Sequence, residues 1–188
     1  MRRICCVKQT KEEYDVVESR TIQAGRFQIV CDTVRESGRD YPYSYVKIKD
    51  CAAVLCIVEQ SVLLLRQYRH TLRSWEYEIP AGSVEDGENP EEAAKREVME
   101  ETGYDIKKMV FLGWYHLSVG STTERVFLYY ALCHKQKKQK LDVLEKIQLY
   151  RVPFEEFEGL MERNEFHQCM GVAAWERYKT ANSGNGGR

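Results

Sequence analysis

The chain has 188 residues, with 28 basic and 29 acidic side chains, a formal net charge of −1 and a hydrophobic fraction of 43%. This length and apolar content predict one domain of ordinary size, with room for a small extra lobe, and exclude global disorder. The balanced charge argues against a protein that coats nucleic acid or an anionic membrane, because both partners favour a strong basic excess.

The apolar and cysteine patterns exclude further classes. The longest apolar run, Cys51 to Val58, is far shorter than the roughly 20 residues that span a bilayer, so no transmembrane helix is expected. The first residues lack the apolar stretch of a signal peptide. The seven cysteines show no CxxC pair and no Cys/His ligand spacing, which favours reduced thiols and a cytoplasmic location.

Short runs typical of β-strands and turn signals fill the first 49 residues. Strands are predicted at 14–22, 27–34 and 43–48, with glycine-containing turns between them. We therefore expect residues 1–49 to form a small antiparallel N-terminal β-lobe.

The remainder, residues 50–182, is predicted to be a second domain that mixes strands and helices, followed by a disordered tail at 183–188. A run of four lysines between 135 and 140 is interpreted as a solvated loop, with a rim that attracts phosphate as the alternative. The predicted strands are 52–58, 62–65, 110–114, 125–132 and 147–152, and the predicted helices are 90–102, 153–164 and 168–181.

Local signals define the first of these helices. Asn89 is a good N-cap, Pro90 suits the first helical position, and Glu92 completes a capping box three residues after the cap. Gly103 suits the position that ends the helix.

Three glutamates lie on one face of this predicted helix. Glu97, Glu100 and Glu101 stand at i, i+3 and i+4, where like charges repel and face the negative end of the helix dipole. A solvated acidic face is one interpretation of this pattern. The other is a cation site, because convergent carboxylates are hard oxygen ligands for Mg²⁺ or Mn²⁺.

The stretch from Gly82 to Tyr104 decides between these interpretations. It matches without a gap the Nudix box, which reads Gly, five residues, Glu, seven residues, Arg-Glu, an aliphatic residue, any residue, Glu-Glu, any residue, Gly and an aliphatic residue. Tyr104 replaces the final aliphatic residue, a conservative change for packing. The chain thus resembles a Nudix hydrolase, and the matching residues are Gly82, Glu88, Arg96, Glu97, Val98, Glu100, Glu101 and Gly103.

Flanking segments are similar to one branch of this family, the ADP-ribose and ADP-sugar pyrophosphatases. Residues 63–82 resemble its Gln-Tyr-Arg and Glu-hydrophobic-Pro-Ala-Gly segments, and 118–131 resemble its Ser-Pro-Gly-x-x-x-Glu stretch, with Val119 in place of the proline associated with ADP-ribose preference. The resemblance implies an α+β fold, an α/β/α Nudix sandwich with a mixed sheet, preceded by the small antiparallel lobe. It also implies a homodimer formed through that lobe.

The resemblance implies a role for each residue of the box. Mg²⁺, with Mn²⁺ as an alternative, would be held by Glu97 and Glu101, with Glu100 close by and the Ala81 carbonyl as a further ligand. Arg96 would orient the glutamates, or else be a surface partner of Glu92 or Glu100. Glu88 is expected to fix the loop before the helix, and Gly82 and Gly103 are positions that need a permissive backbone.

Outside the box, the branch places its general base on an acidic loop before a strand. Glu145 is favoured for this role over Asp142, and a solvated carboxylate is the alternative. The substrate contacts that the resemblance implies are Arg69 for phosphate, Glu78, Glu124, and Tyr43 for stacking on adenine, although Tyr43 could equally be a packing residue.

The implied function is Mg²⁺-dependent hydrolysis of the diphosphate bond of ADP-ribose or a related nucleoside diphosphate sugar, giving AMP and a sugar phosphate. Two alternatives stay open: a Nudix hydrolase of GDP-mannose or an oxidised nucleoside triphosphate, and a non-catalytic sensor that binds ADP-ribose. The expected partners are the small-molecule substrate and a second copy of the chain, with no nucleic acid and no membrane.

Overall fold

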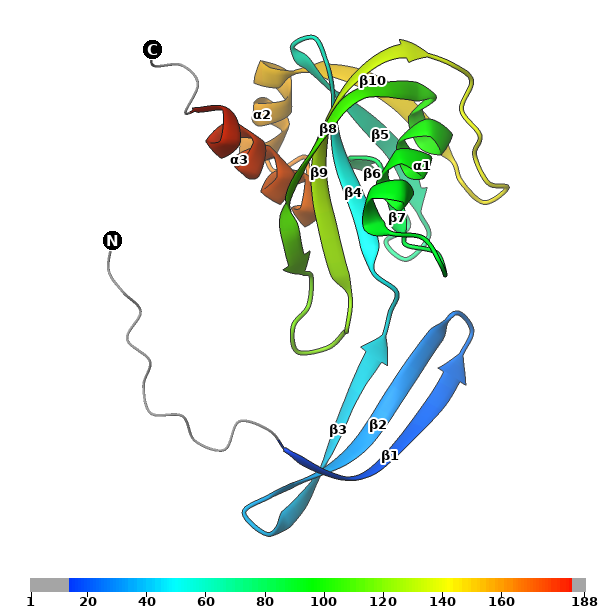
Figure 1. The fold of residues 1–188 in the computed structure, drawn as a ribbon, viewed down its shortest axis with the longest axis vertical. Coiled ribbons are helices and arrows are strands. Elements are labelled where there is room, and N and C mark those ends of the chain that lie inside the picture. Colours follow the sequence, from blue (N-terminus) through cyan, green and yellow to red (C-terminus); the bar gives the residue numbers. More distant parts are fainter. Residues whose placement is uncertain (1–13, 184–188) are drawn as a thin grey trace. The chain divides into compact units, whose positions relative to one another are not determined.

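The computed structural model describes residues 14–183, which form two compact units. The first contains residues 14–48 together with the loop 118–123, and the second contains residues 49–117 and 124–183 (Figure 1). The expectations for the N-terminal segment, including Cys5 and Cys6, and for residues 184–188 of the tail lie outside the described residues. The predicted lobe therefore gains a loop from much later in the chain.

The first unit is a three-stranded antiparallel sheet in the order β1 (Asp15–Ala24), β2 (Phe27–Glu36) and β3 (Arg39–Lys47), as the sequence predicted. Ser37 and Gly38 both have positive φ and join β2 to β3 in a two-residue turn, which matches the twist of paired strands. The loop 118–123 is bonded to β3, because the Val46 N–H donates to the Ser121 carbonyl at 2.9 Å.

The second unit is built on a seven-stranded mixed sheet. Strands β4 and β9 run parallel and the other pairs are antiparallel. Strand β4 is central and buried on both faces, which explains its unbroken apolar sequence. The strands are β4 (Cys51–Val58), β5 (Ser61–Arg69), β6 (Ser74–Glu78), β7 (Ala81–Ser83), β8 (Tyr104–His116), β9 (Arg125–Gln136) and β10 (Ile147–Pro153).

Helices cover both faces of this sheet (Figure 1). Helix α1 (Pro90–Thr102) packs Ala93, Ala94 and Val98 on one face. Helices α2 (Phe154–Glu162) and α3 (Cys169–Ser183) pack Phe157 and Trp175 on the other. The result is the three-layer α/β/α sandwich that the resemblance implied.

The strand boundaries show where sequence patterns failed. Strand β8 begins at Tyr104, six residues before the predicted start, because three register shifts against β9 interrupt its alternation of apolar and polar residues. The short strands β6 and β7 were not predicted, and β9 continues to Gln136 into the lysine run that was expected to form a loop. Helix α3 continues through Ser183, which was assigned to the tail.

Two structural findings bear on the excluded classes. Among residues 14–183, none of the helices combines the length and the apolar content that crossing a bilayer requires. The five cysteines in this range, Cys31, Cys51, Cys56, Cys133 and Cys169, are free thiols.

Candidate active site

Helix α1 begins and ends as its sequence predicts. The Asn89 side chain accepts hydrogen bonds from the Glu91 and Glu92 N–H groups, each at 3.0 Å, and the Glu92 carboxylate accepts the Asn89 N–H at 3.0 Å. At the other end Gly103 is left-handed, with a φ of 72°, and its N–H donates to the Met99 carbonyl. These caps fix the helix, and with it the direction of its acidic face.

That face is partly buried. Glu97 and Glu101 are only 8% and 3% exposed, whereas 39% of the Glu100 side chain is exposed. Burial, and then repulsion from Glu97, raises the pKa of Glu101 well above its usual range, although the Ala81 N–H donates to Glu101 Oε2 at 3.0 Å. Burial also raises the pKa of Glu97. Two carboxylates are therefore held close together where their charge is poorly solvated.

Gly82 lets β7 pass directly over one of these carboxylates. A Cβ at this position would lie 2.0 Å from Glu97 Oε1, a distance that no real contact could accept. Gly103 meets a similar limit, because its Cβ would lie 2.2 Å from the Lys137 carbonyl oxygen. Both glycines of the box therefore serve close approach of the backbone.

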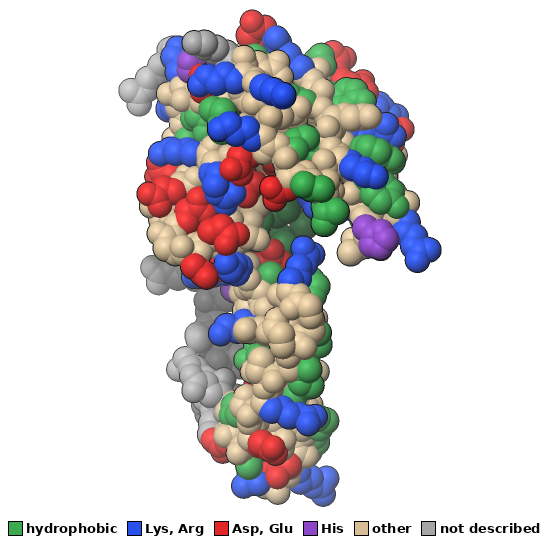
Figure 2. Space-filling view, turned by 90° about the vertical axis from the view of Figure 1, so that its right-hand side faces the viewer, with side chains coloured by type: hydrophobic (Ala, Val, Ile, Leu, Met, Phe, Trp, Pro, Cys, Tyr) green, Lys and Arg blue, Asp and Glu red, His purple; other side chains and the backbone are tan. Residues whose placement is uncertain are grey.

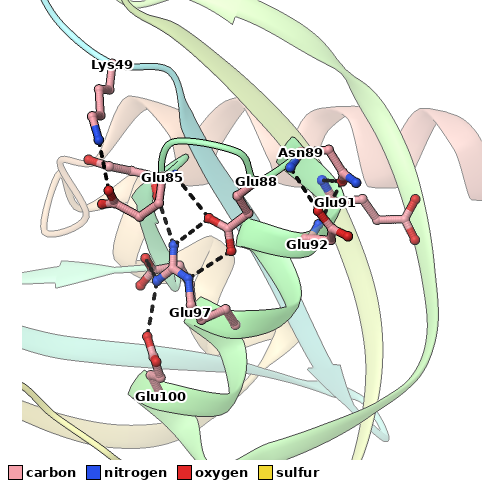
Figure 3. A network of polar contacts seen from close by, with 10 residues as sticks. Lys49, Glu85, Glu88, Asn89, Glu91, Glu92, Glu97 and Glu100 are labelled. Atoms are coloured by element: carbon pink, nitrogen blue, oxygen red, sulfur yellow. Dashed lines mark hydrogen bonds and ion pairs between the residues drawn. The ribbon is translucent and has the colours of Figure 1, made fainter.

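Arg96 connects three acids of the box, Glu88, Glu97 and Glu100, which are labelled in Figure 3. Its Nε and Nη2 bind Glu88 at 2.9 and 3.0 Å, and its Nη1 binds Glu97 at 2.6 Å and Glu100 at 3.1 Å. Nη2 also donates to the Ser83 carbonyl at 2.9 Å. The bond to Glu88 is the main cause of the raised pKa of Arg96, and it lowers the pKa of Glu88. The structure thus supports both interpretations of Arg96, since Glu100 is also its i,i+4 partner.

The chemistry of these donors fits a hard divalent cation. Within residues 14–183, no three acidic, histidine or cysteine side chains meet in an arrangement ready to hold an ion, and Arg96 occupies Glu97 Oε1. Yet Glu97 and Glu101 are buried carboxylates whose raised pKa values reflect unfavourable charge, and a cation would relieve that charge. The structure records the Ala81 N–H in contact with Glu101, so the role of the Ala81 carbonyl stays a prediction.

Arg69 and Glu78 form an ion pair on β5 and β6. Arg69 Nε donates to Glu78 Oε1 at 2.6 Å, and Nη2 bonds to Oε2 in the same fork. This bond is the main cause of the raised pKa of Arg69, and the charges of Glu101 and Glu145 add to it. Arg69 therefore lies within electrostatic reach of the buried Glu101.

Two further predicted residues, Glu145 and Glu124, are acidic. Glu145 is half-buried, accepts the Asp142 N–H at 2.8 Å, and its charge helps to raise the pKa of both Glu97 and Glu101. The charge of Glu124 also reaches this region, because Glu124, Glu97 and Glu101 add to burial in raising the pKa of Cys51 to about 12. The structure thus brings Glu145 within electrostatic reach of the α1 carboxylates, whereas Glu124 is linked to them only through Cys51, and its own carboxylate is affected by burial and by Asp50.

Tyr43 belongs to the first unit. Its ring centroid lies 6.5 Å from that of Tyr14 and 6.4 Å from that of Tyr45. These ring contacts agree with the packing interpretation of Tyr43, and stacking on adenine stays a prediction.

A cavity of about 340 Å³ beside the Arg69–Glu78 pair adds residues that sequence reasoning missed. His167 lies on its wall and contacts Glu76 at 2.9 Å, which raises the pKa of His167. The pKa of Glu76 is lowered, first by its hydrogen bond from Ser74 and then by the contact with His167. The sequence pattern carries no signal for these residues, because His167 and Glu76 are 91 positions apart. The cavity is lined by Arg69, Thr71, Leu72, Glu76, Glu78, His167, Gln168 and Met170.

Comparison with known proteins relates the chain to one family. The NUDIX domain model matches residues 47–170. An ADP-ribose pyrophosphatase of Bacillus subtilis (strain 168) is 33% identical over 141 residues, which are 73% of this chain and 76% of that protein. A methanol dehydrogenase activator of Bacillus methanolicus is 32% identical over 149 residues, 77% of this chain and 80% of that protein.

A solved structure shares the fold. It is described as an ADP compounds hydrolase and superimposes with a TM-score of 0.84 over 95% of this chain and 99% of that chain, at 21% identity. The domain match and the Bacillus subtilis relative show that the chain belongs to the NUDIX domain family.

The close approach at Gly82 leads to a prediction about stability. Gly82→Ala should lower the free energy of unfolding by about 1–3 kcal/mol, because its methyl group must displace the buried Glu97 carboxylate. The matched control is Gly159→Ala in α2, where the new methyl meets the flexible end of Arg163 and helix propensity favours alanine. Urea unfolding measures both variants, and equal stability of Gly82→Ala and the parent protein would contradict the contact.

Proposed function

We propose that this protein hydrolyses the diphosphate bond of ADP-ribose or a related nucleoside diphosphate sugar with Mg²⁺, giving AMP and a sugar phosphate. The observation that carries the proposal is the placement of the buried Glu101, on the same helix face as the buried Glu97, within electrostatic reach of Arg69. A diphosphate needs both kinds of group, because a cation must neutralise its charge and a guanidinium fork can hold its oxygens.

Each part of the site has a role in this proposal. Glu97 and Glu101 would hold Mg²⁺, or Mn²⁺, with Glu100 beside them, and the chemistry that the ion supplies when bound is neutralisation of the diphosphate charge. Arg96 would keep Glu97 and Glu100 oriented through the bonds it makes to both. Arg69, braced by Glu78, would bind a phosphate oxygen of the substrate.

Glu145 is proposed as the general base. Water attacks one phosphorus of the diphosphate, the water loses a proton to the carboxylate, and the bond from that phosphorus to the bridging oxygen breaks. Support comes from the loop position of Glu145, its partial burial, and its electrostatic reach to Glu97 and Glu101.

The nature of the nucleotide and the assembly are also part of the proposal. The two pyrophosphatase and hydrolase relatives favour an ADP-linked substrate. A homodimer is favoured by the first unit, a single sheet layer with large apolar side chains at its surface, among them Val16 and Ile22. Figure 2 shows apolar side chains at the surface of this sheet. The free thiols favour a reducing, cytoplasmic location.

A substrate panel tests the reaction. The purified protein is incubated with Mg²⁺ or Mn²⁺ and with ADP-ribose, ADP-glucose, GDP-mannose and 8-oxo-dGTP, and the monophosphates released are quantified. We expect AMP and ribose 5-phosphate from ADP-ribose, and no product after chelation of the metal. Turnover of GDP-mannose or 8-oxo-dGTP alone would replace the proposed substrate, and binding of ADP-ribose without any turnover would indicate a sensor.

The base is tested by one variant and its neighbour. Glu145→Gln should lower kcat by about 100-fold or more and leave metal binding intact, because an amide cannot accept the proton. Asp142→Asn, on the same loop, keeps the backbone N–H that binds Glu145 and should retain activity within about twofold. The reverse pattern would assign the role to Asp142.

A further inference from the structure

Gln168 lies one residue before α3, and both ends of its side-chain amide are bonded to β6 and the residue that follows it. Gln168 Oε1 accepts the Ile79 N–H at 2.9 Å, and Gln168 Nε2 donates to Glu78 Oε2 at 3.2 Å. Glu78 is 6% exposed and is the carboxylate that holds the Arg69 guanidinium. A residue 90 positions away in the sequence thus completes the hydrogen bonding of the Arg69–Glu78 pair.

The position of Gln168 is itself firmly fixed. The backbone carbonyl oxygen of Gln168 accepts the N–H groups of Gly171 and Val172 at 3.1 and 3.3 Å, in the first turn of α3. Gly171 has space only for hydrogen, because a Cβ there would lie 2.4 Å from Phe166 Cζ and 3.3 Å from Gln168 Oε1. Phe166 is buried and packs edge-on against Phe157 of α2, with ring centroids 5.0 Å apart. The backbone of Gln168 is therefore held against the layer formed by α2 and α3, and its side-chain amide extends from this fixed point.

The two bonds of Gln168 act on two parts of the site. The bond to Glu78 fixes the carboxylate that orients Arg69. The bond to Ile79 fixes the backbone two residues before Ala81, whose N–H donates to Glu101. The cavity of about 340 Å³ is lined by all three of these hydrogen-bonded residues, Gln168, Glu78 and Arg69. Their alignment therefore determines how the N–H groups of the Arg69 guanidinium face a ligand in the cavity.

We propose that Gln168 is a positioning residue for substrate binding, which acts by holding Glu78 so that Arg69 presents its guanidinium to the diphosphate. This inference rests on the proposed function only for the identity of the ligand. The positioning itself is a property of the protein without substrate, and it can be measured separately.

The direct test follows Arg69 in the free protein. In ¹⁵N-labelled protein the Arg69 Nε–H, which donates to Glu78, should exchange slowly with solvent, and in Gln168→Leu its exchange should accelerate by at least about tenfold. Unchanged exchange in Gln168→Leu, with α3 still folded by circular dichroism, would overturn the proposal whatever the activity. Accelerated exchange in a protein that hydrolyses no diphosphate sugar would keep the positioning role and remove the proposed function.

The kinetic test uses Gln168→Glu, which can still accept the Ile79 N–H but no longer donates to Glu78 and places a like charge beside it. We expect KM for ADP-ribose to rise about tenfold, because a bond to a charged group is lost, while kcat changes by less than about twofold. The matched control is Gln148→Glu on β10, an exposed glutamine bonded to Tyr150, which should leave both constants unchanged.

A double-mutant cycle separates positioning from a general effect on α3. In an Arg69→Leu background Gln168→Glu should change KM by less than about twofold, because the group through which Gln168 acts is gone. An undiminished tenfold effect in that background would show that Gln168 acts elsewhere, and would overturn the proposal.

Discussion

The repulsion between two buried carboxylates, Glu97 and Glu101, is the constraint on which the rest of the site depends. Packing of α1 on the sheet places both where water reaches them poorly, and each raises the energy of the other's charge. The protein offsets part of this cost with the Ala81 N–H, which donates to Glu101, and with two cations: Arg96, which bonds to Glu97, and Arg69, whose charge reaches Glu101. The pKa of Glu101 stays raised despite these groups, and this remaining unfavourable charge is the physical argument for the proposed divalent metal.

The surrounding structure follows from the need to hold this unfavourable arrangement in place. The capping box at Asn89 anchors the start of α1, and the left-handed Gly103 ends it within a turn of Glu101. The last turn of α1, all of whose residues the structure describes, carries no basic residue, so the negative end of the helix dipole remains uncompensated there. On the face that Figure 2 shows, acidic side chains gather on the second unit, with basic side chains among them. Such sites retain unfavourable charge because the ligand, when it binds, removes it.

Local sequence predicted the parts of the site that depend on spacing along one helix. The cap, the shared face of Glu97, Glu100 and Glu101, and the glycine at the helix end are all set by residues within five positions of one another. The box also predicted that Glu88 would fix the loop before the helix, and the structure shows its carboxylate bonded to Arg96 and to the Glu85 N–H.

Contacts between distant segments could not be predicted in this way. The bulges of β8 hid its period, so its first six residues were missed. The bonds of Gln168 to β6 and Ile79 arise only when α3 folds back on the sheet, and no motif marks them. Glu92 was one possible partner for Arg96, but the capping box uses its carboxylate instead.

Thermal unfolding of Glu101→Gln, with and without Mg²⁺, tests the central claim most directly. Without metal the variant should be more stable than the parent protein at pH 7.5 and above, by about 2–4 °C for each kcal/mol of repulsion removed. Mg²⁺ at about 100 times its dissociation constant should stabilise the parent protein by roughly 2.7 kcal/mol and leave the variant unchanged. Glu91→Gln, an exposed substitution on the same helix, serves as the control and should respond to Mg²⁺ as the parent does. A Glu101→Gln protein that is no more stable without metal, and that responds equally to Mg²⁺, would contradict the account.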